Sequence, residues 1–213
     1  MVKINRTPKP DDIVITSDEH YRNGPAHDII RNDFNNKCYI CECKSNSMEI
    51  EHRNPDKSLR YCWDNLFYAC RHCNSIKGTS YADIIDCTII DPEEHIELSL
   101  ELFPSEMVAI SQQNGSCLSI GSTLELLRLV YGGAKTKVQI AGFESMLAEI
   151  KEELVKLQEA MIMYLDNNTD QSRKEVAKEI ILKLIDKNAK YAAIKRTIIR
   201  SVGTYKNEFG QYL

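Results

Sequence analysis

Two Cys-x-x-Cys pairs constrain this chain more than any other feature of its sequence. The first pair is Cys38 and Cys41, and the second is Cys70 and Cys73. Each pair forms a knuckle that points two thiolates at one ion, and two pairs separated by a short span are typical of a tetrahedral zinc site. The spacing therefore predicts a structural Zn²⁺ on these four cysteines. Cys43 offers an alternative pair with Cys41, but its Cys-x-Cys spacing is the less usual one.

The rest of the cysteine content favours a reducing compartment. The chain has eight cysteines, and its polar N-terminal segment lacks the apolar core of a signal peptide. These features predict a cytoplasmic protein with metal-bound and free thiols instead of disulfides. No stretch has the apolar length that a membrane span needs, so we expect no membrane partner. The cysteines outside the zinc site are expected to be free and at least partly buried: Cys43, Cys62, Cys87 and Cys117.

Charge is distributed unevenly along the 213 residues. The net charge of −4 excludes a surface that is basic throughout, as in a non-specific nucleic-acid binder. Residues 78–127 contain nine acids and no Lys or Arg, whereas residues 172–213 contain ten Lys or Arg against four acids. The basic segment indicates either a surface for phosphates or an acidic partner, or simply a solvated helix face.

The hydrophobic pattern predicts an α+β chain in four parts. Residues 1–30 form an N-terminal arm that leads into a helix from Pro25, and residues 31–80 form the zinc module. Residues 81–122 form a small acidic β-rich insertion with an antiparallel sheet, and residues 123–213 form a C-terminal helical domain. The hydrophobic content of 43% suffices for one sizeable core or two small ones.

The same pattern predicts the individual elements. In the zinc module, we expect a strand over 48–52 and a helix that opens at Asp64, which gives a ββα unit closed by zinc. In the insertion, we expect strands over 84–90 and 96–102, and a hairpin whose turn is Gln112-Gln113-Asn114-Gly115 between strands over 107–111 and 116–120. In the last part, we expect helices over 123–131, 143–165, 176–185 and 191–202, with glycine ends at Gly132-Gly133 and Gly203.

Further polar residues stand at fixed places around the cysteines. In chain order they are Glu51-His52, Asp64-Asn65-Leu66, Asn74 and Lys77. This order of elements resembles the HNH nucleases, which have the ββα-metal fold. The resemblance covers residues 31–80, about a quarter of the chain. Glu51 stands where many members have Asp, and Asn74 where many have His.

The resemblance implies a role for each residue in phosphodiester hydrolysis. His52 is the general base, since a neutral imidazole accepts a proton near pH 7. Glu51 and Asn74 are oxygen ligands of a catalytic Mg²⁺ or Mn²⁺, which acts as a Lewis acid. Asn65 braces the loop that carries the base. Neighbours on a strand point to opposite faces, so Glu51 and His52 share a site only if the strand bends or ends there.

Three neighbouring residues have two readings each. Lys77 either contacts a phosphate or is solvated. Trp63 either stacks on a base or packs in the core, and packing is favoured. His72 lies between two zinc ligands, where we expect it exposed on the knuckle and not bound to the metal.

The flanking segments resemble the HNH nuclease subunits of bacterial Septu-type anti-phage defence systems. This resemblance is carried by the spacing of Ile50–Pro55 to Trp63–Leu66, and by the segments from Ile90 to Ile96 and from Ala192 to Arg200. The resemblance implies an ATPase subunit as partner, docked on the helical tail, with contact residues Tyr191, Lys195, Arg196 and Arg200. The substrate is nucleic acid, DNA in preference to RNA. The alternatives are a stand-alone restriction-type HNH nuclease, and a non-catalytic zinc module for DNA binding or scaffolding.

Overall fold

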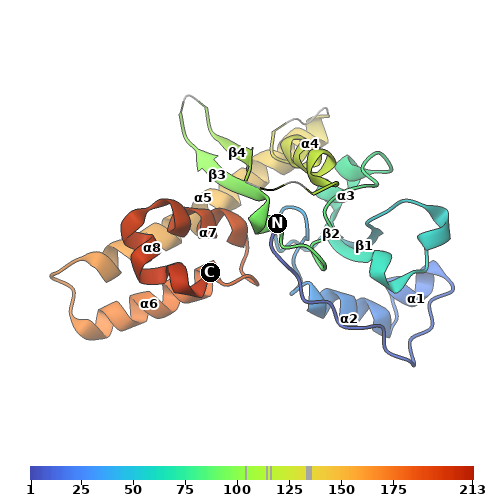
Figure 1. The fold of residues 1–213 in the computed structure, drawn as a ribbon, viewed down its shortest axis with the longest axis horizontal. Helices are drawn as coiled ribbons and strands as arrows, with labels where there is room; N and C mark the ends of the chain where they lie inside the picture. The colour runs from blue at the N-terminus through green and yellow to red at the C-terminus, as the bar shows by residue number, and fades with distance from the viewer. Residues whose placement is uncertain (104, 114, 116, 133–135) are drawn as a thin grey trace.

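Two small antiparallel sheets and the helices around them make up the α+β fold of the computed structural model (Figure 1). The structure describes residues 1–103, 105–113, 115, 117–132 and 136–213. The first sheet pairs β1 (Met48–His52) with β2 (Leu66–Cys70), and His52 lies opposite Leu66. The second pairs β3 (Ile96–Glu101) with β4 (Met107–Gln112). The predicted α+β class is therefore confirmed.

The zinc module contains a ββα unit, but one of its elements differs from the prediction. The segment after Asp64 is a strand and not a helix, because all five residues of β2 are buried and a short apolar run of this kind suits a buried strand. Asp64 itself lies in a 3₁₀ turn, Trp63–Asn65. The helix of the unit is α3 (Arg71–Lys77), and α1 (Asp18–Arg22) and α2 (Pro25–Asp33) precede the unit in the chain.

The insertion contains two of the four predicted strands, and they pair differently from the prediction. The strands over 96–102 and 107–111 are confirmed, but they pair with each other. The predicted strand over 84–90 is wrong: the segment is irregular and turns at Asp86, whose carboxylate accepts the amide of Thr88 at 2.9 Å. Asn114 of the predicted turn and Ser116 of its second strand lie outside the described residues, and Ile120 already begins a helix.

The remainder of the chain is helical, as predicted. The helices are α4 (Ile120–Val130), α5 (Lys137–Leu165), α6 (Gln171–Ile185), α7 (Ala192–Ser201) and α8 (Gly203–Phe209). The long helix begins earlier than its apolar stripe suggested, because Thr136 and Gln139 form a capping box at its start. Gly203 opens α8 instead of ending the last helix, and Gly133 of the predicted Gly-Gly end lies outside the described residues.

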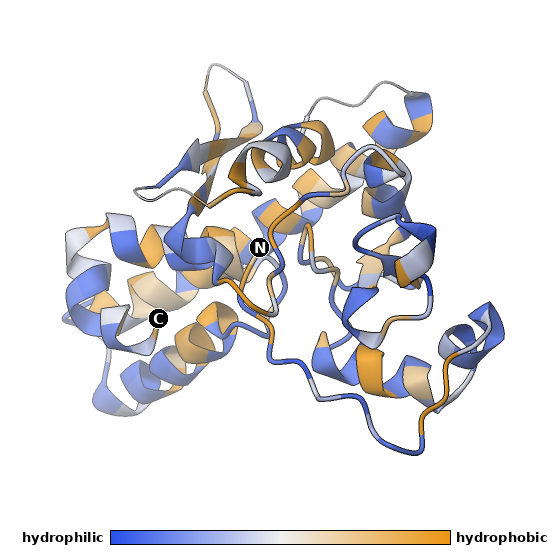
Figure 2. Cartoon of the chain, turned by 45° about the vertical axis from the view of Figure 1, so that its right-hand side comes forward, coloured by the Kyte–Doolittle hydropathy of each residue, from blue (hydrophilic) through white to orange (hydrophobic). Residues whose placement is uncertain are grey.

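Two hydrophobic clusters form the core. The larger joins the ββα unit to α2, α4, the first half of α5 and the N-terminal segment, which is buried at Met1, Val2, Ile4, Ile13 and Ile15. The smaller lies between the second half of α5 and α6, α7 and α8, at Leu157, Ala160, Met161, Ile181, Ile185, Ile199 and Phe209. Hydrophobic and hydrophilic residues alternate along these helices (Figure 2), as expected for helices that bury one face. Within the described residues, no helix combines the length and the apolar character of a membrane span.

Candidate active site and metal centre

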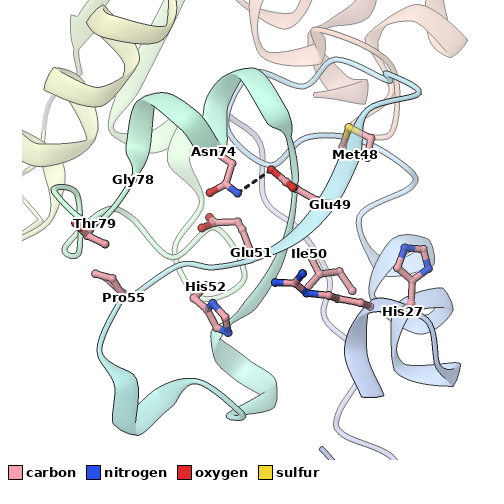
Figure 3. Close-up of a pocket in the computed structure, with 11 residues that line it drawn as sticks. His27, Met48, Glu49, Ile50, Glu51, His52, Pro55, Asn74, Gly78 and Thr79 are labelled. Atoms are coloured by element: carbon pink, nitrogen blue, oxygen red, sulfur yellow. Dashed lines mark hydrogen bonds between the residues drawn. The ribbon is translucent and has the colours of Figure 1, made fainter. Parts of the chain in front are cut away.

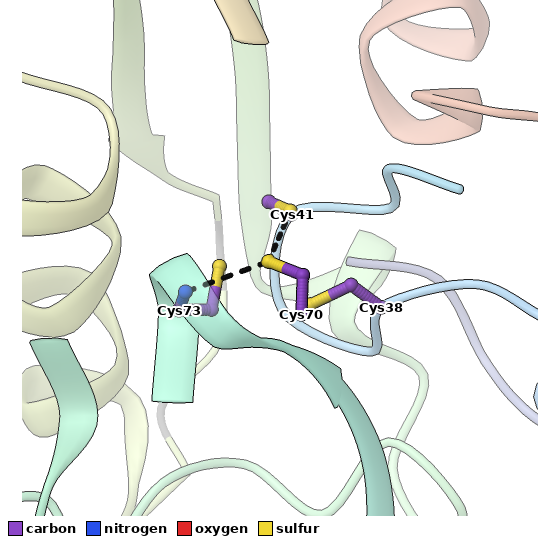
Figure 4. A group of neighbouring side chains, drawn as sticks. All are labelled: Cys38, Cys41, Cys70 and Cys73. Carbon is purple, nitrogen blue, oxygen red and sulfur yellow. Dashed lines mark hydrogen bonds between the residues drawn. The ribbon is translucent and has the colours of Figure 1, made fainter. Parts of the chain in front are cut away.

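The four predicted cysteines form one buried cluster. The sulfur atoms of Cys38, Cys41, Cys70 and Cys73 all lie within 4.8 Å of one another (Figure 4). The Cys41 and Cys70 sulfurs are 3.7 Å apart, close to the edge of about 3.8 Å that a tetrahedron with Zn–S bonds of about 2.3 Å requires. The cluster is thus compatible with zinc, and the predicted set of ligands is confirmed as a geometric site.

Backbone hydrogen bonds shape both knuckles. The first knuckle closes through the Cys38 amide, which donates to the Cys43 carbonyl at 2.9 Å, and Glu42 takes a left-handed conformation with φ of 65°. In the second knuckle, the Cys73 amide donates to the Cys70 sulfur at 3.4 Å. Burial opposes ionisation of the Cys38 thiol, but hydrogen bonds from the neighbouring thiols hold its pKa well below the usual range. In the same cluster, hydrogen bonds with neighbouring thiols raise the pKa of Cys41 and burial raises the pKa of Cys73. A metal ion needs its thiol ligands deprotonated, so its binding here would release protons.

The other cysteines are not members of the four-sulfur cluster, although the Cys43 thiol makes hydrogen bonds with Cys38, Cys41 and Cys70. Cys43 and Cys87 are buried and Cys117 is half-buried, as expected for free thiols. Cys62 is exposed, so its predicted burial is wrong. It lies in the loop between the two strands of the ββα unit, directly after the exposed residues Arg60 and Tyr61. His72 is half-buried, and its Nε2 lies 3.3 Å from the Val130 carbonyl oxygen; it is therefore neither exposed nor part of the cluster.

A polar cleft of about 570 Å³ opens beside β1 and α3 (Figure 3). Its lining brings together three of the residues that the resemblance singled out, Glu51, His52 and Asn74. Helices α1 and α2 contribute Arg22 and His27 to the same cleft. Residues from three separate parts of the chain thus meet around one open site.

Glu51 lies at the bottom of this site and is held by two partners. One carboxylate oxygen accepts from Lys77 Nζ at 2.9 Å, and the other accepts the Tyr39 hydroxyl. Burial raises the pKa of Glu51, and Lys77 is the main opposing influence. Lys77 is only 1% exposed and also donates to the His52 carbonyl at 2.7 Å. Both readings of Lys77 from the sequence are therefore wrong, since it is neither solvated nor directed at a substrate.

Asn74 extends from α3 toward β1, where Glu49 fixes its side chain. Asn74 Nδ2 donates to Glu49 Oε1 at 2.8 Å, which assigns the other end of the amide as the free ligand oxygen (Figure 3). Sequence reasoning missed Glu49. The signal was available, because Glu49 and Glu51 are two residues apart on a strand and therefore share a face.

His52 is the last residue of β1, which explains how it shares the cleft with Glu51. The two side chains lie on opposite sides of the strand (Figure 3), but both reach the cleft where the strand ends. His52 Nε2 is 2.9 Å from the Arg60 carbonyl oxygen. A carbonyl can only accept, so Nε2 carries the proton and Nδ1 keeps a lone pair. Burial lowers the pKa of His52, which favours the neutral imidazole that a general base requires.

Asn65 makes the contacts that a bracing role requires. It is buried, and its side chain accepts the Asn54 amide and donates to the Asn54 carbonyl, both at 2.8 Å. It also donates to the Leu59 carbonyl at 3.2 Å. The side chain thus spans the loop that follows His52. Next to it, Trp63 is buried and donates Nε1 to the Thr7 carbonyl at 2.9 Å, so it packs in the core as expected.

The four tail residues expected to dock a partner form contacts within the chain. Tyr191, Lys195 and Arg196 are buried. Lys195 pairs with Glu153 at 2.9 Å, and Arg196 and Arg200 both pair with Glu93, at 2.9 and 2.7 Å. The acidic segment before α4 thus neutralises part of the basic tail. The three buried residues cannot form a free surface, whereas Arg200, whose side chain is 39% exposed, stays a predicted contact residue.

Comparison of the chain with protein-family models, with curated proteins and with solved structures finds no match. Beyond the buried four-cysteine cluster, the resemblance to HNH nucleases therefore stays a prediction from the motif residues.

Proposed function

We propose that the chain is a metal-dependent HNH-type endonuclease that hydrolyses phosphodiester bonds of nucleic acid. The observation that supports this proposal best is the meeting of Glu51, His52 and Asn74 around one open cleft, on a ββα unit closed by a four-cysteine cluster. The four cysteines would hold Zn²⁺ as a structural ion. A zinc module that only binds DNA or serves as a scaffold would not need these three polar residues beside an open cleft.

The donors at the cleft suit a hard divalent cation such as Mg²⁺ or Mn²⁺. Glu51 offers a carboxylate and Asn74 an amide oxygen, and both atom types belong to the set that these ions prefer. Lys77 and Tyr39 use one lone pair on each Glu51 oxygen, so further lone pairs remain for a metal. When bound there, the cation would act as a Lewis acid on the scissile phosphate.

The protein's own residues would handle the proton. His52 Nδ1 would take a proton from the attacking water, while the Arg60 carbonyl holds the opposite side of the ring. Asn65 would keep that carbonyl in place through the loop. Arg22 on the rim would attract the phosphate backbone. The open, polar shape of the cleft suits a strand of DNA better than a small molecule.

We also propose, from the flanking segments, that this nuclease works in an anti-phage complex with an ATPase subunit. The two segments that resemble Septu-type subunits contact each other, since Glu93 of the first pairs with Arg196 and Arg200 of the second. These ion pairs therefore stabilise the fold, and a partner must bind residues other than the buried ones. A stand-alone nuclease remains the alternative, and it predicts cleavage by the isolated chain.

The central test is His52→Ala in a plasmid-cleavage assay with Mg²⁺. Loss of a general base should lower the rate by about 10²–10⁴. Zinc content and thermal stability should stay at the wild-type level, and His95→Ala, away from the cleft, should cut normally. Near-normal cleavage by His52→Ala, with and without an ATPase partner, would remove the residue from this role. Asn74→Ala should instead raise the Mg²⁺ concentration required.

A further inference from the structure

We propose that Asp18 and Arg60 are positioning residues for His52, so that helix α1, outside the HNH motif, is part of the active site. This inference rests on the proposed function, because it assigns a task to the general base. It starts from two hydrogen-bonded contacts that link Asp18 to Arg60 and Arg60 to His52. Asp18 precedes the motif by some distance, and Arg60 follows His52 within the loop.

The first link joins α1 to the loop. Asp18 accepts from Arg60 Nε at 2.9 Å and from Arg60 NH2 at 2.7 Å, one bond to each carboxylate oxygen. Such a two-point contact fixes the direction of the guanidinium and not only its distance. The second link joins the loop to the base, through the Arg60 carbonyl and His52 Nε2. Arg60 thus holds α1 with its side chain and His52 with its backbone.

The two links act on the least supported part of the loop. Asn65 anchors the preceding carbonyl, that of Leu59, from the protein interior. Arg60 itself closes the short 3₁₀ turn Lys57–Leu59 and is largely exposed. Without Asp18, the Arg60 peptide would be free to rotate about the Leu59 anchor. The pair therefore fixes the orientation of the carbonyl that selects the His52 tautomer.

Helix α1 touches the base directly as well. The Tyr21 ring packs edge-on against the His52 imidazole, with centroids 5.6 Å apart and planes at 84°. Tyr21 is fully buried, and Asp18, three residues before it on α1, is half-buried. One turn of α1 thus contacts the His52 ring through Tyr21, and through Asp18 it pairs with Arg60 in the loop that binds His52.

The charges that act on His52 come from these same elements. They are Arg60 of the loop, Asp18 of α1 and Lys77 of α3. The hydrogen bonds from Arg60 lower the pKa of Asp18 to about 2, so the pair stays ionised while His52 titrates. An exposed pair of this kind contributes little to stability, about 0.2–1 kcal/mol. Its loss should therefore change the imidazole without unfolding the protein.

The test reads the imidazole itself by ¹⁵N NMR of histidine-labelled protein, with the His52 signals assigned from His52→Ala. In the wild type, Nε2 should carry the proton. In Arg60→Ala, which keeps the backbone carbonyl, and in Asp18→Asn, the proton should distribute over both nitrogens. Glu106→Gln breaks a similar exposed pair with Lys151, far from the cleft, and should leave the His52 signals unchanged.

Kinetics complete the test. Misplacing the base should lower kcat by about tenfold to a hundredfold and leave KM nearly unchanged. Arg60→Lys should not restore the rate, because a lysine cannot form the two-point contact. A wild-type tautomer in both Arg60→Ala and Asp18→Asn would overturn the positioning role. If the variants alter the tautomer but the wild-type protein cuts no nucleic acid, the positioning role of Asp18 and Arg60 stands. The proposed nuclease function is then overturned.

Discussion

The ββα unit and the C-terminal helices differ in the contacts that stabilise them. The unit consists of two short strands and one short helix, too little to bury a core of its own, and it gathers four cysteines at its centre. Helices α5 to α8 stack on one another and bury a separate cluster. The unit can therefore leave polar side chains open along a cleft, whereas the helices use their charges to close contacts with the rest of the chain.

Metal removal should separate the two regions most strongly. In Cys70→Ser with Cys73→Ser, zinc should be lost, and with it a binding free energy on the order of 10–16 kcal/mol. Amide hydrogen exchange should then become fast in the ββα unit, while α6 to α8 stay protected. Cys43→Ser should keep one zinc per chain by metal analysis. Equal loss of protection in both regions would show that the C-terminal helices depend on the metal as much as the ββα unit does.

Breaking one buried ion pair in each region should give similar, smaller losses. Lys77→Met leaves Glu51 without its cation, and Arg196→Met combined with Arg200→Met does the same to Glu93. A buried carboxylate that loses its partner destabilises the folded state by about 3–5 kcal/mol. Urea unfolding should show this for Lys77→Met and for the double variant, but not for Arg173→Met, whose side chain is 76% exposed. A wild-type midpoint for the double variant would show that these tail cations do not stabilise the fold.

The pH dependence should distinguish the cleft from the helices by its sign. Burial lowers the pKa of His52 below its ordinary 6.5, so the unfolded chain binds this proton more readily than the folded one. Stability should thus fall as pH drops below about 6.5, and this slope should weaken in His52→Gln. The rate of cleavage should follow a base with a midpoint below about 6.5. If lowering the pH already reduces the cleavage rate with a midpoint above about 6.5, this would argue against a neutral, partly buried His52.

The smallest effect is expected at a carboxylate that serves two cations. Glu153 accepts from buried Lys195 and from Lys156, whose side chain is 56% exposed. Lys156→Ala should cost only about 0.2–0.5 kcal/mol, as for other helix-surface pairs, whereas Lys195→Met should cost several times more. Chemical denaturation of the two variants side by side gives the ratio. Equal losses would mean that burial does not decide the strength of these pairs.

The sequence by itself determined the parts of this protein whose spacing is local. A thiolate pair needs two intervening residues, so the four-cysteine cluster could be read directly, and so could the helices of the tail from their apolar steps. The strand β2 was misread because a short apolar run looks alike in a helix and in a buried strand. The predicted strand over 84–90 failed for a related reason, since Ile84, Ile85 and Cys87 are buried although the segment forms no strand.

Only the tertiary structure decided which polar groups meet. Glu49 with Asn74, Lys77 with Glu51 and Arg196 with Glu93 join residues that no local period relates. The basic tail looked like a surface because charge composition carries no information on burial. Folding brings the acidic segment against it, and a charge in the interior must be paired there because water no longer solvates it. The fate of each charged residue thus depended on a partner distant in sequence, which local spacing could not reveal.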